Sequence, residues 1–143
     1  MLYVFNKILL MLHFIGLAMG LSVPFANIIM AALMSKAQAP EKAVLGRFPL
    51  AMSKVGKIGL ALLWATGITM VFTRWSGFST LPRTFMFKLT AVVLLTITVG
   101  YISLLETRVK KGDMAALARI QTAGKIAFAL GITAIIFAVL TFN

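Results

Sequence analysis

The chain has 143 residues, of which 61% are hydrophobic and only 12% are charged. A soluble domain of this size carries about twice that share of charged residues, so the composition excludes an ordinary soluble domain and predicts an all-α integral membrane protein. The 14 lysines and arginines outnumber the 3 acidic residues, but they lie in short gaps between apolar runs. Membrane topology explains such a pattern, and nucleic-acid binding is disfavoured. With no cysteine, disulfides, thiolate metal sites, iron–sulfur clusters and a cysteine nucleophile are excluded.

Four apolar runs are long enough to cross a bilayer as helices, which takes about 20 residues for a hydrocarbon core of about 30 Å. We expect one four-helix domain over residues 1–143, with transmembrane helices at about 7–34, 50–73, 84–106 and 114–142. The first apolar run, Ile8–Met34, is far longer than the roughly 7–15 apolar residues of a signal peptide and predicts a retained span. It is also too long to stand upright, so this helix should tilt or kink at Pro24.

Local signals place the ends of the later helices. Pro49 suits the first turn of a helix, so the second helix should begin near Leu50. Asp113 can cap the start of the fourth helix. The connection before it is then short, which makes the third and fourth helices an antiparallel hairpin.

The basic residues predict how the chain is oriented in the membrane. Ten of them lie in or beside the first and third connections: Lys36, Lys42, Arg47, Lys54, Lys57, Arg108, Lys110, Lys111, Arg119 and Lys125. The other four lie toward the opposite side: Lys7, Arg74, Arg83 and Lys88. By the positive-inside rule, residues 35–53 and 107–121 are cytoplasmic and both termini lie outside the cytoplasm. This predicts an up-down antiparallel bundle in a bacterial-type inner membrane.

The first helix carries a stripe of small and polar residues on an otherwise apolar surface. Steps of three or four place the members of this stripe on one helix face: His13, Gly16, Gly20, Pro24, Asn27 and Ala31. A lipid-immersed helix buries such a stripe against neighbouring helices, so His13 should point into the bundle. Gly16 and Gly20 form a GxxxG match, which we interpret as close helix packing in preference to a dimer interface. The sequence leaves open whether the chain forms a homo-oligomer.

His13 and Lys88 are expected at matching depths. His13 follows Lys7 by six residues and Lys88 follows Arg83 by five, so each lies roughly 7–9 Å along its helix from the non-cytoplasmic interface. Ionisable residues inside a membrane are costly and mark candidate functional sites. Two structural interpretations stay open beside this one. Lys88 can snorkel to the surface, and His13 can be a hydrogen-bonding partner between helices.

Methionines offer a second kind of chemistry near the same interface. Met11, Met70 and Met86 lie in the outer halves of the first three helices, and thioether and imidazole ligands suit copper(I) or, as a Met/His pair, haem iron. Packing explains the same methionines equally well. All 3 acidic residues lie at the cytoplasmic edge, so an exporter that needs an intramembrane carboxylate is disfavoured. A carboxylate dyad, a Ser-His-Asp triad and a phosphate loop are not visible either.

Two short motifs resemble those of a known family. Leu12-His13-Phe14-Ile15-Gly16 and Phe87-Lys88-Leu89 are similar to the first-helix histidine and the third-helix lysine that are characteristic of the HemJ-type protoporphyrinogen oxidases. The chain also resembles the related copper-resistance D group of small four-helix membrane proteins. The HemJ resemblance implies haem b bound through His13 and oxidation of protoporphyrinogen to protoporphyrin, with electrons passed to a membrane acceptor such as a quinone. A further third-helix histidine of that family has no counterpart here, because His13 is the only histidine.

Three hypotheses on function follow. The leading one is a membrane oxidoreductase in which His13 ligates haem iron and Lys88 offers a cation to a propionate or an anionic substrate. The second is a copper-binding or copper-transport protein that uses His13 with Met11, Met70 or Met86. The third is a non-catalytic accessory protein, in which His13 only hydrogen-bonds between helices.

Overall fold

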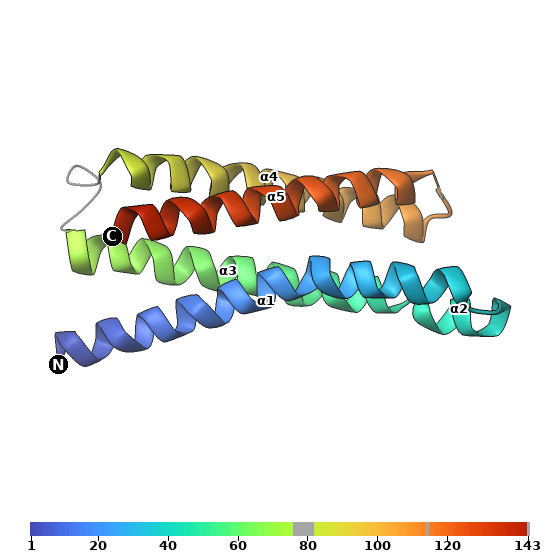
Figure 1. Ribbon diagram of the computed structural model, residues 1–143, viewed down its shortest axis with the longest axis horizontal. Helices are drawn as coiled ribbons and strands as arrows, with labels where there is room; N and C mark the ends of the chain where they lie inside the picture. Colours follow the sequence, from blue (N-terminus) through green and yellow to red (C-terminus); the bar gives the residue numbers. More distant parts are fainter. Residues whose placement is uncertain (76–81, 114, 143) are drawn as a thin grey trace. The chain divides into compact units, whose positions relative to one another are not determined.

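The computed structural model describes residues 1–75, 82–113 and 115–142, apart from the side chains of Leu2, Ala43, Arg74, Trp75 and Phe142. Within these ranges the chain forms five helices (Figure 1): α1 (Leu2–Lys36), α2 (Ala39–Leu45), α3 (Phe48–Trp75), α4 (Arg83–Lys110) and α5 (Ala116–Phe142). The four long helices are each long and apolar enough to cross a membrane. The predicted all-α fold with four candidate membrane spans is therefore confirmed.

The long helices extend beyond most of the predicted ends. Hydropathy reports only the apolar part of a helix, whereas α1 runs on to Lys36 and α4 to Lys110, into basic flanking sequence. Helix α3 begins at Phe48, so Pro49 lies in its first turn, where the missing amide hydrogen leaves no bond unmade. Met114, where we expected the last helix to begin, lies outside the described residues, as does the side chain of Arg74.

The expected connection at residues 35–53 contains the short helix α2. Pro40 stands in its first turn, and the backbone N–H of Gln38 donates to Oε2 of Glu41 at 3.0 Å. This is half of a capping box, and the side chain of Gln38 completes it by accepting from the backbone of Glu41. The Gln38-to-Glu41 spacing is the sequence signal for this helix.

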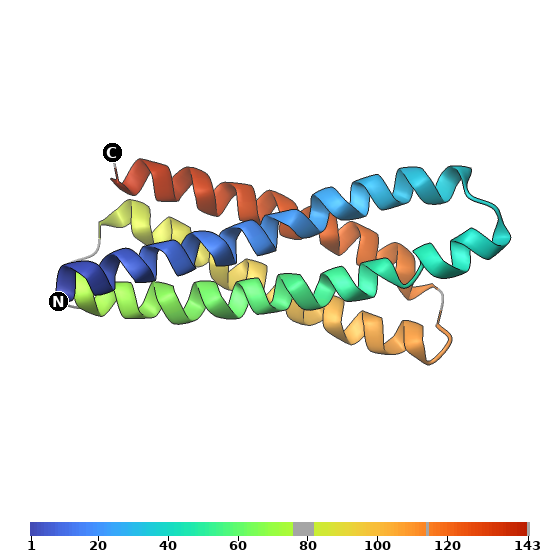
Figure 2. The ribbon, with the colours of Figure 1, turned by 90° about the horizontal axis from the view of Figure 1, so that it is seen from below.

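The chain divides into two compact units, Met1–Phe78 and Ser79–Asn143, and we describe each by itself. In the first unit α1 packs against α3, with α2 between them in the chain, and in the second α4 packs against α5 (Figure 2). The single four-helix domain and the common side of the two termini stay predictions.

A glycine ends α4 and allows the chain to turn into α5. Gly112 has a φ of 99°, a left-handed conformation that side chains with a Cβ rarely adopt. The amide of Gly112 donates to the carbonyl oxygen of Val109, and the amide of Asp113 to that of Arg108. This is a Schellman motif. The carbonyl oxygen of Asp113 then accepts from the amide of Ala116 at the start of α5, so the predicted hairpin is present.

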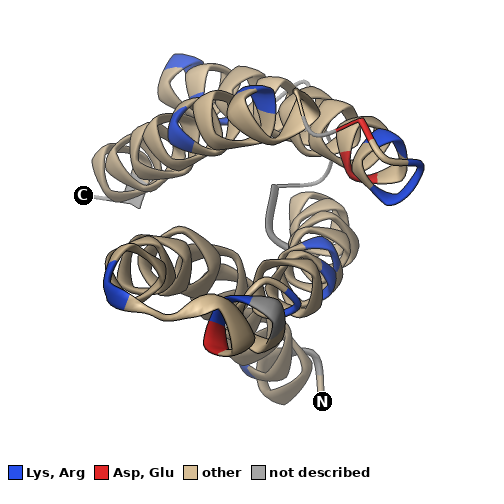
Figure 3. Ribbon diagram, turned by 90° about the vertical axis from the view of Figure 1, so that its right-hand side faces the viewer, with Lys and Arg blue, Asp and Glu red and all other residues tan. Residues whose placement is uncertain are grey.

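In each unit, ribbon positions of basic residues lie at and beside one connection, α2 in the first unit and the α4–α5 turn in the second (Figure 3). In the first unit, Lys36 and Lys42 lie beside or within α2, whereas Lys7 lies near the opposite end of α1. In the second unit, Arg108 and Lys110 lie in the last turn of α4, whereas Arg83 begins that helix. Within each unit, charge is therefore distributed as the positive-inside rule requires of a helical hairpin.

The α1–α3 pair is antiparallel and keeps one register along its length. Interhelical hydrogen bonds join Asn6 to Thr73 and His13 to Thr66. Further along, Gly59 meets the backbone of Gly16 and Gly20, and the space beside Gly56 is filled by Val23. From the Asn6–Thr73 pair to His13–Thr66 and on to Val23–Gly56, the pairs advance along α1 by as many residues as they go back along α3. One line of contact, the α1–α3 contact line, therefore runs down both helices.

Beside this line the backbones of two glycines, Gly16 and Gly59, approach closely. A Cβ added to Gly16 would lie 2.9 Å from the carbonyl oxygen of Gly59, and one added to Gly59 would lie 2.7 Å from that of Gly16. Small residues at such crossings let helix backbones come together, and this association does not need a hydrophobic driving force. The interpretation of Gly16 as a packing residue is therefore confirmed.

We predict that Gly59→Ala destabilises the first unit by roughly 1–3 kcal/mol, the usual range for overpacking. The new methyl group would meet Met19 Cβ at 2.8 Å and the amide nitrogen of Gly20 at 3.0 Å, as well as the Gly16 carbonyl. Backbone atoms cannot move aside as a flexible side chain can. Thermal unfolding of the detergent-purified protein measures the effect.

Gly20→Ala and Gly100→Ala are the matched controls. A Cβ at either position has no heavy atom within 4 Å, and alanine raises helix propensity, so both variants should unfold at or slightly above the wild-type temperature. If Gly20→Ala is as destabilising as Gly59→Ala, the glycine pair of α1, Gly16 and Gly20, also packs against a surface outside the α1–α3 pair.

Candidate functional site

The side chain of His13, on α1, is hydrogen-bonded to α3. Its Nδ1 atom is 2.8 Å from Oγ1 of Thr66, and the bond is partly buried. The prediction that His13 faces a neighbouring helix is confirmed. That helix is α3, the next long helix after α1 in the chain.

The hydroxyl of Thr66 determines which nitrogen of His13 carries the proton. Thr66 Oγ1 donates to the carbonyl oxygen of Leu62, one turn back in α3, at 2.6 Å. A hydroxyl has a single proton, so Oγ1 accepts from His13, and we assign the proton to Nδ1. In the neutral imidazole the lone pair is then on Nε2, which is the nitrogen that would ligate a metal.

Burial makes this bond energetically important. Thr66 is 3% exposed and is the buried polar side chain of the described residues. A buried polar group that loses a hydrogen-bond partner costs about 1–3 kcal/mol, so loss of the His13–Thr66 bond would destabilise the α1–α3 pair. The orientation of the imidazole is therefore set by α3.

Gly67 of α3 lies beside the imidazole of His13. A Cβ added to Gly67 would lie 3.6 Å from Cε1 of His13, so the histidine ring lies over the glycine backbone. Cε1 is bonded to both ring nitrogens, and a larger residue at position 67 would therefore approach Nε2 as well as Nδ1.

A second polar contact lies two helical turns from His13, toward the N-terminus of α1. The hydroxyl of Thr73 donates to Oδ1 of Asn6 at 2.8 Å. Between the two polar contacts the register places Leu9 opposite Met70, and both side chains are buried. Apolar packing thus separates the His13 bond from the end of the helix pair.

Lys88 lies in the second turn of α4, in the other unit, and is half-buried. Its Nζ atom is 5.6 Å from the centroid of the Phe85 ring, a cation–π distance. Phe85 precedes Lys88 by one turn, so the lysine side chain bends toward the start of its helix, as a snorkelling side chain does. The units are described separately, and the expected neighbourhood of His13 and Lys88 stays a prediction.

The three candidate methionine ligands lie in different surroundings. Met11 is 65% exposed, Met86 is 51% exposed on α4, and Met70 is 9% exposed in the α1–α3 contact. Residues two apart on a helix do not face each other, so Met11 and His13 lie on different sides of α1. Among the described residues, no group of three or more His, Cys, Asp or Glu side chains could hold a metal ion.

Thr66 and Gly67 are the site residues that the sequence analysis missed. Thr66 precedes Arg74 by eight residues, so counting inward from the interface puts it roughly 12 Å deep, close to the level of His13. The depth count that paired His13 with Lys88 would therefore have found Thr66 if hydroxyl residues had been included. No sequence signal distinguishes Gly67 from the other glycines of the chain.

No family model, no curated protein and no solved structure matches this chain. Its class follows from the fold, since four candidate membrane-spanning helices indicate a multi-pass membrane protein. What it does has to be inferred from the His13 site.

We predict that Thr66→Val, which removes the hydroxyl and keeps the shape, lowers the free energy of unfolding by about 1–3 kcal/mol. It leaves the Nδ1–H of His13 without its acceptor. Thr69→Val is the matched control, because the Thr69 hydroxyl donates to Ala65 of its own helix. Thr66→Ser should restore stability.

Nitrogen-15 shifts of the imidazole provide a more direct measurement. In the wild type they should report a protonated Nδ1 and an unprotonated Nε2, and in Thr66→Val a mixture of tautomers. A wild-type spectrum with the proton on Nε2 would contradict the assignment.

Proposed function

We propose that this chain is a multi-pass membrane oxidoreductase that binds haem b through Nε2 of His13. The observation that supports this most is the hydrogen-bonded series from His13 through Thr66 to the Leu62 carbonyl. A histidine that ligates a metal usually donates its other ring hydrogen to a nearby acceptor, which orients the ring and raises the basicity of the ligating nitrogen. Thr66 would have this role.

The donor chemistry of the residues around His13 suits haem. A neutral imidazole is a common axial ligand of haem iron, and haem when bound supplies one-electron chemistry. Thr66 would hold the ring in place, and Gly67 adds no side chain beside Cε1 of the ring. The surrounding apolar side chains of α1 and α3 would exclude water from the site.

The resemblance to the HemJ-type enzymes supports a particular reaction. Protoporphyrinogen would lose six electrons and six protons to become protoporphyrin, and three membrane quinones would each take up two electrons and two protons to become quinols. Lys88 would bind a carboxylate of the substrate or of the haem, since an ammonium group forms strong charge-assisted bonds with carboxylates.

An absorption spectrum tests the haem proposal. We expect the protein, produced with ample haem and purified in detergent, to show a Soret band that His13→Ala abolishes. His13→Gln should abolish it as well, although its amide can still donate to Thr66 and maintain the fold. Met11→Leu is the matched control on the same helix and should keep the band. A wild-type protein without a Soret band, or one that retains copper and no haem, would contradict the proposal.

Substrate binding by Lys88 is tested separately. Lys88→Gln should raise the KM for protoporphyrinogen by about tenfold, the equivalent of one charge-assisted bond, while the Soret band stays unchanged. Lys7→Gln removes the same charge from a lysine that lies over the ring of Tyr3, and should leave KM unaltered. The appearance of porphyrin fluorescence measures the rate. Equal KM values for both variants and the wild type would exclude Lys88 from the substrate site.

A further inference from the structure

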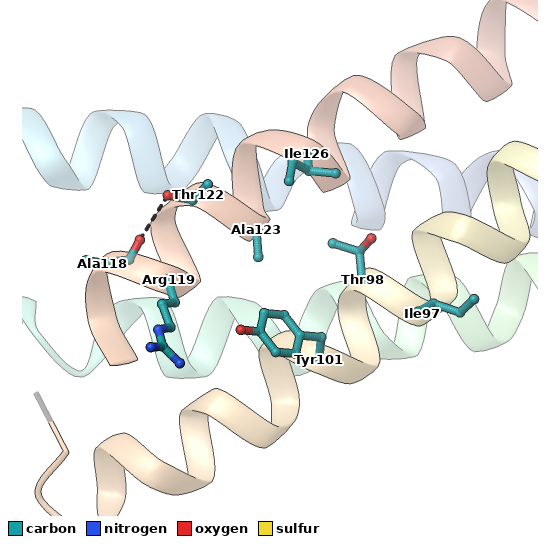
Figure 4. Close-up of a pocket in the computed structure, with 8 residues that line it drawn as sticks. All are labelled: Ile97, Thr98, Tyr101, Ala118, Arg119, Thr122, Ala123 and Ile126. Atoms are coloured by element: carbon teal, nitrogen blue, oxygen red, sulfur yellow. Dashed lines mark hydrogen bonds between the residues drawn. The ribbon is translucent and has the colours of Figure 1, made fainter. Parts of the chain in front are cut away.

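The second unit has a groove between α4 and α5, with a volume of about 560 Å³. Its walls come from both helices at the spacing of one helix face (Figure 4) and include Ile97, Thr98, Tyr101, Arg119, Thr122 and Ile126. The groove lies within two candidate membrane-spanning helices and toward the α4–α5 turn.

Most of the wall is apolar in effect, although it contains two threonines. Thr122 donates to the carbonyl oxygen of Ala118 at 3.2 Å, and Thr98 to that of Leu94 at 2.8 Å. Both hydroxyls are therefore used within their own helices. From Arg119 to Ile126 this surface extends roughly 10 Å along α5, at 1.5 Å per residue.

Polar chemistry is concentrated at one end of the groove. The guanidinium of Arg119 and the hydroxyl of Tyr101 extend into the same space from facing helices (Figure 4). Both side chains are exposed, and a guanidinium is suited to two-point binding of phosphate. The α4–α5 turn beside this end adds Arg108, Lys110 and Lys111.

We infer that this groove binds an anionic phospholipid. Arg119 and Tyr101 hold the phosphate, and an acyl chain lies along the apolar wall toward Ile126. An apolar trough that ends in a cation beside a basic turn complements an anionic amphiphile in the leaflet on the turn side, where clustered lysines and arginines attract anionic headgroups. The inference does not depend on haem binding at His13.

Lipid retention during purification tests this inference. The full-length protein is delipidated in mild detergent, incubated with palmitoyl-oleoyl phosphatidylglycerol or phosphatidylcholine, and analysed by native mass spectrometry. We expect retention of phosphatidylglycerol to exceed that of phosphatidylcholine roughly fivefold, the effect of one basic residue near an anionic surface. Arg119→Gln should remove this preference, and Tyr101→Phe should reduce it.

Lys125→Gln is the matched control for charge. Lys125 is on the same helix and exposed, but it is outside the groove lining, so the preference should survive. Ala118→Phe fills the groove and should reduce retention of both lipids, whereas Ala129→Phe, at an exposed position elsewhere on α5, should not.

Three results would overturn the inference. The first is equal retention of the two lipids by the wild type. The second is an equal loss in Lys125→Gln and Arg119→Gln, which would mean that overall charge and not the groove selects the lipid. The third is an Ala118→Phe variant that melts at a lower temperature but retains lipid normally, which would mean that protein fills the groove.

Discussion

The close approach of α1 and α3 at Gly16 and Gly59 is the constraint on which the candidate site depends. Helices in lipid gain little from hydrophobic burial, so they associate through close packing and interhelical hydrogen bonds. At this crossing each glycine would place a Cβ within 3 Å of the other's carbonyl oxygen. The two helices are therefore close enough for the short side chain of Thr66, two turns from Gly59 on α3, to reach His13, one turn from Gly16 on α1.

The threonine hydroxyls of the described residues differ in whether they bond only within their own helix or also to another helix. Thr69, Thr90 and Thr133 each donate to a carbonyl oxygen one turn back in their own helix, which satisfies the hydroxyl proton without another helix. Thr66 makes the same bond but also lies on the α1–α3 contact line, where its oxygen accepts from His13. The local bond directs the hydroxyl proton backward, and this is why the interhelical bond has a defined direction.

The two units pack by different means. In the α1–α3 pair glycines bring the backbones together, whereas a Cβ at Gly100 of α4 or Gly124 of α5 would have no near neighbour. The α4–α5 pair instead buries Ala91, Leu105 and Ala123, and stacks the ring of Phe87 on that of Phe137 at 5.4 Å. The groove beside Arg119 lies between these two helices.

The sequence by itself determined the elements, because hydropathy and helix length are local properties. It predicted four apolar helices, the α4–α5 hairpin and the packing role of Gly16, all of which are found. The sequence also identified His13 as a candidate site residue, because it is the only histidine and lies within an apolar helix. The helix ends and α2 were harder to predict, since polar flanking residues can form a helix or a loop and capping contacts decide between them.

Only the tertiary structure decided what His13 meets. Many residues of α3 lie near its depth, and the sequence does not say which of them the register of the helix pair brings opposite. That register is set by the contact between Gly16 and Gly59, which are far apart in the chain. It turns Thr66 toward His13 and thereby selects the tautomer of the ring. A pattern along the sequence of one helix cannot predict the tautomer of His13, because the position of the proton depends on an atom of another helix.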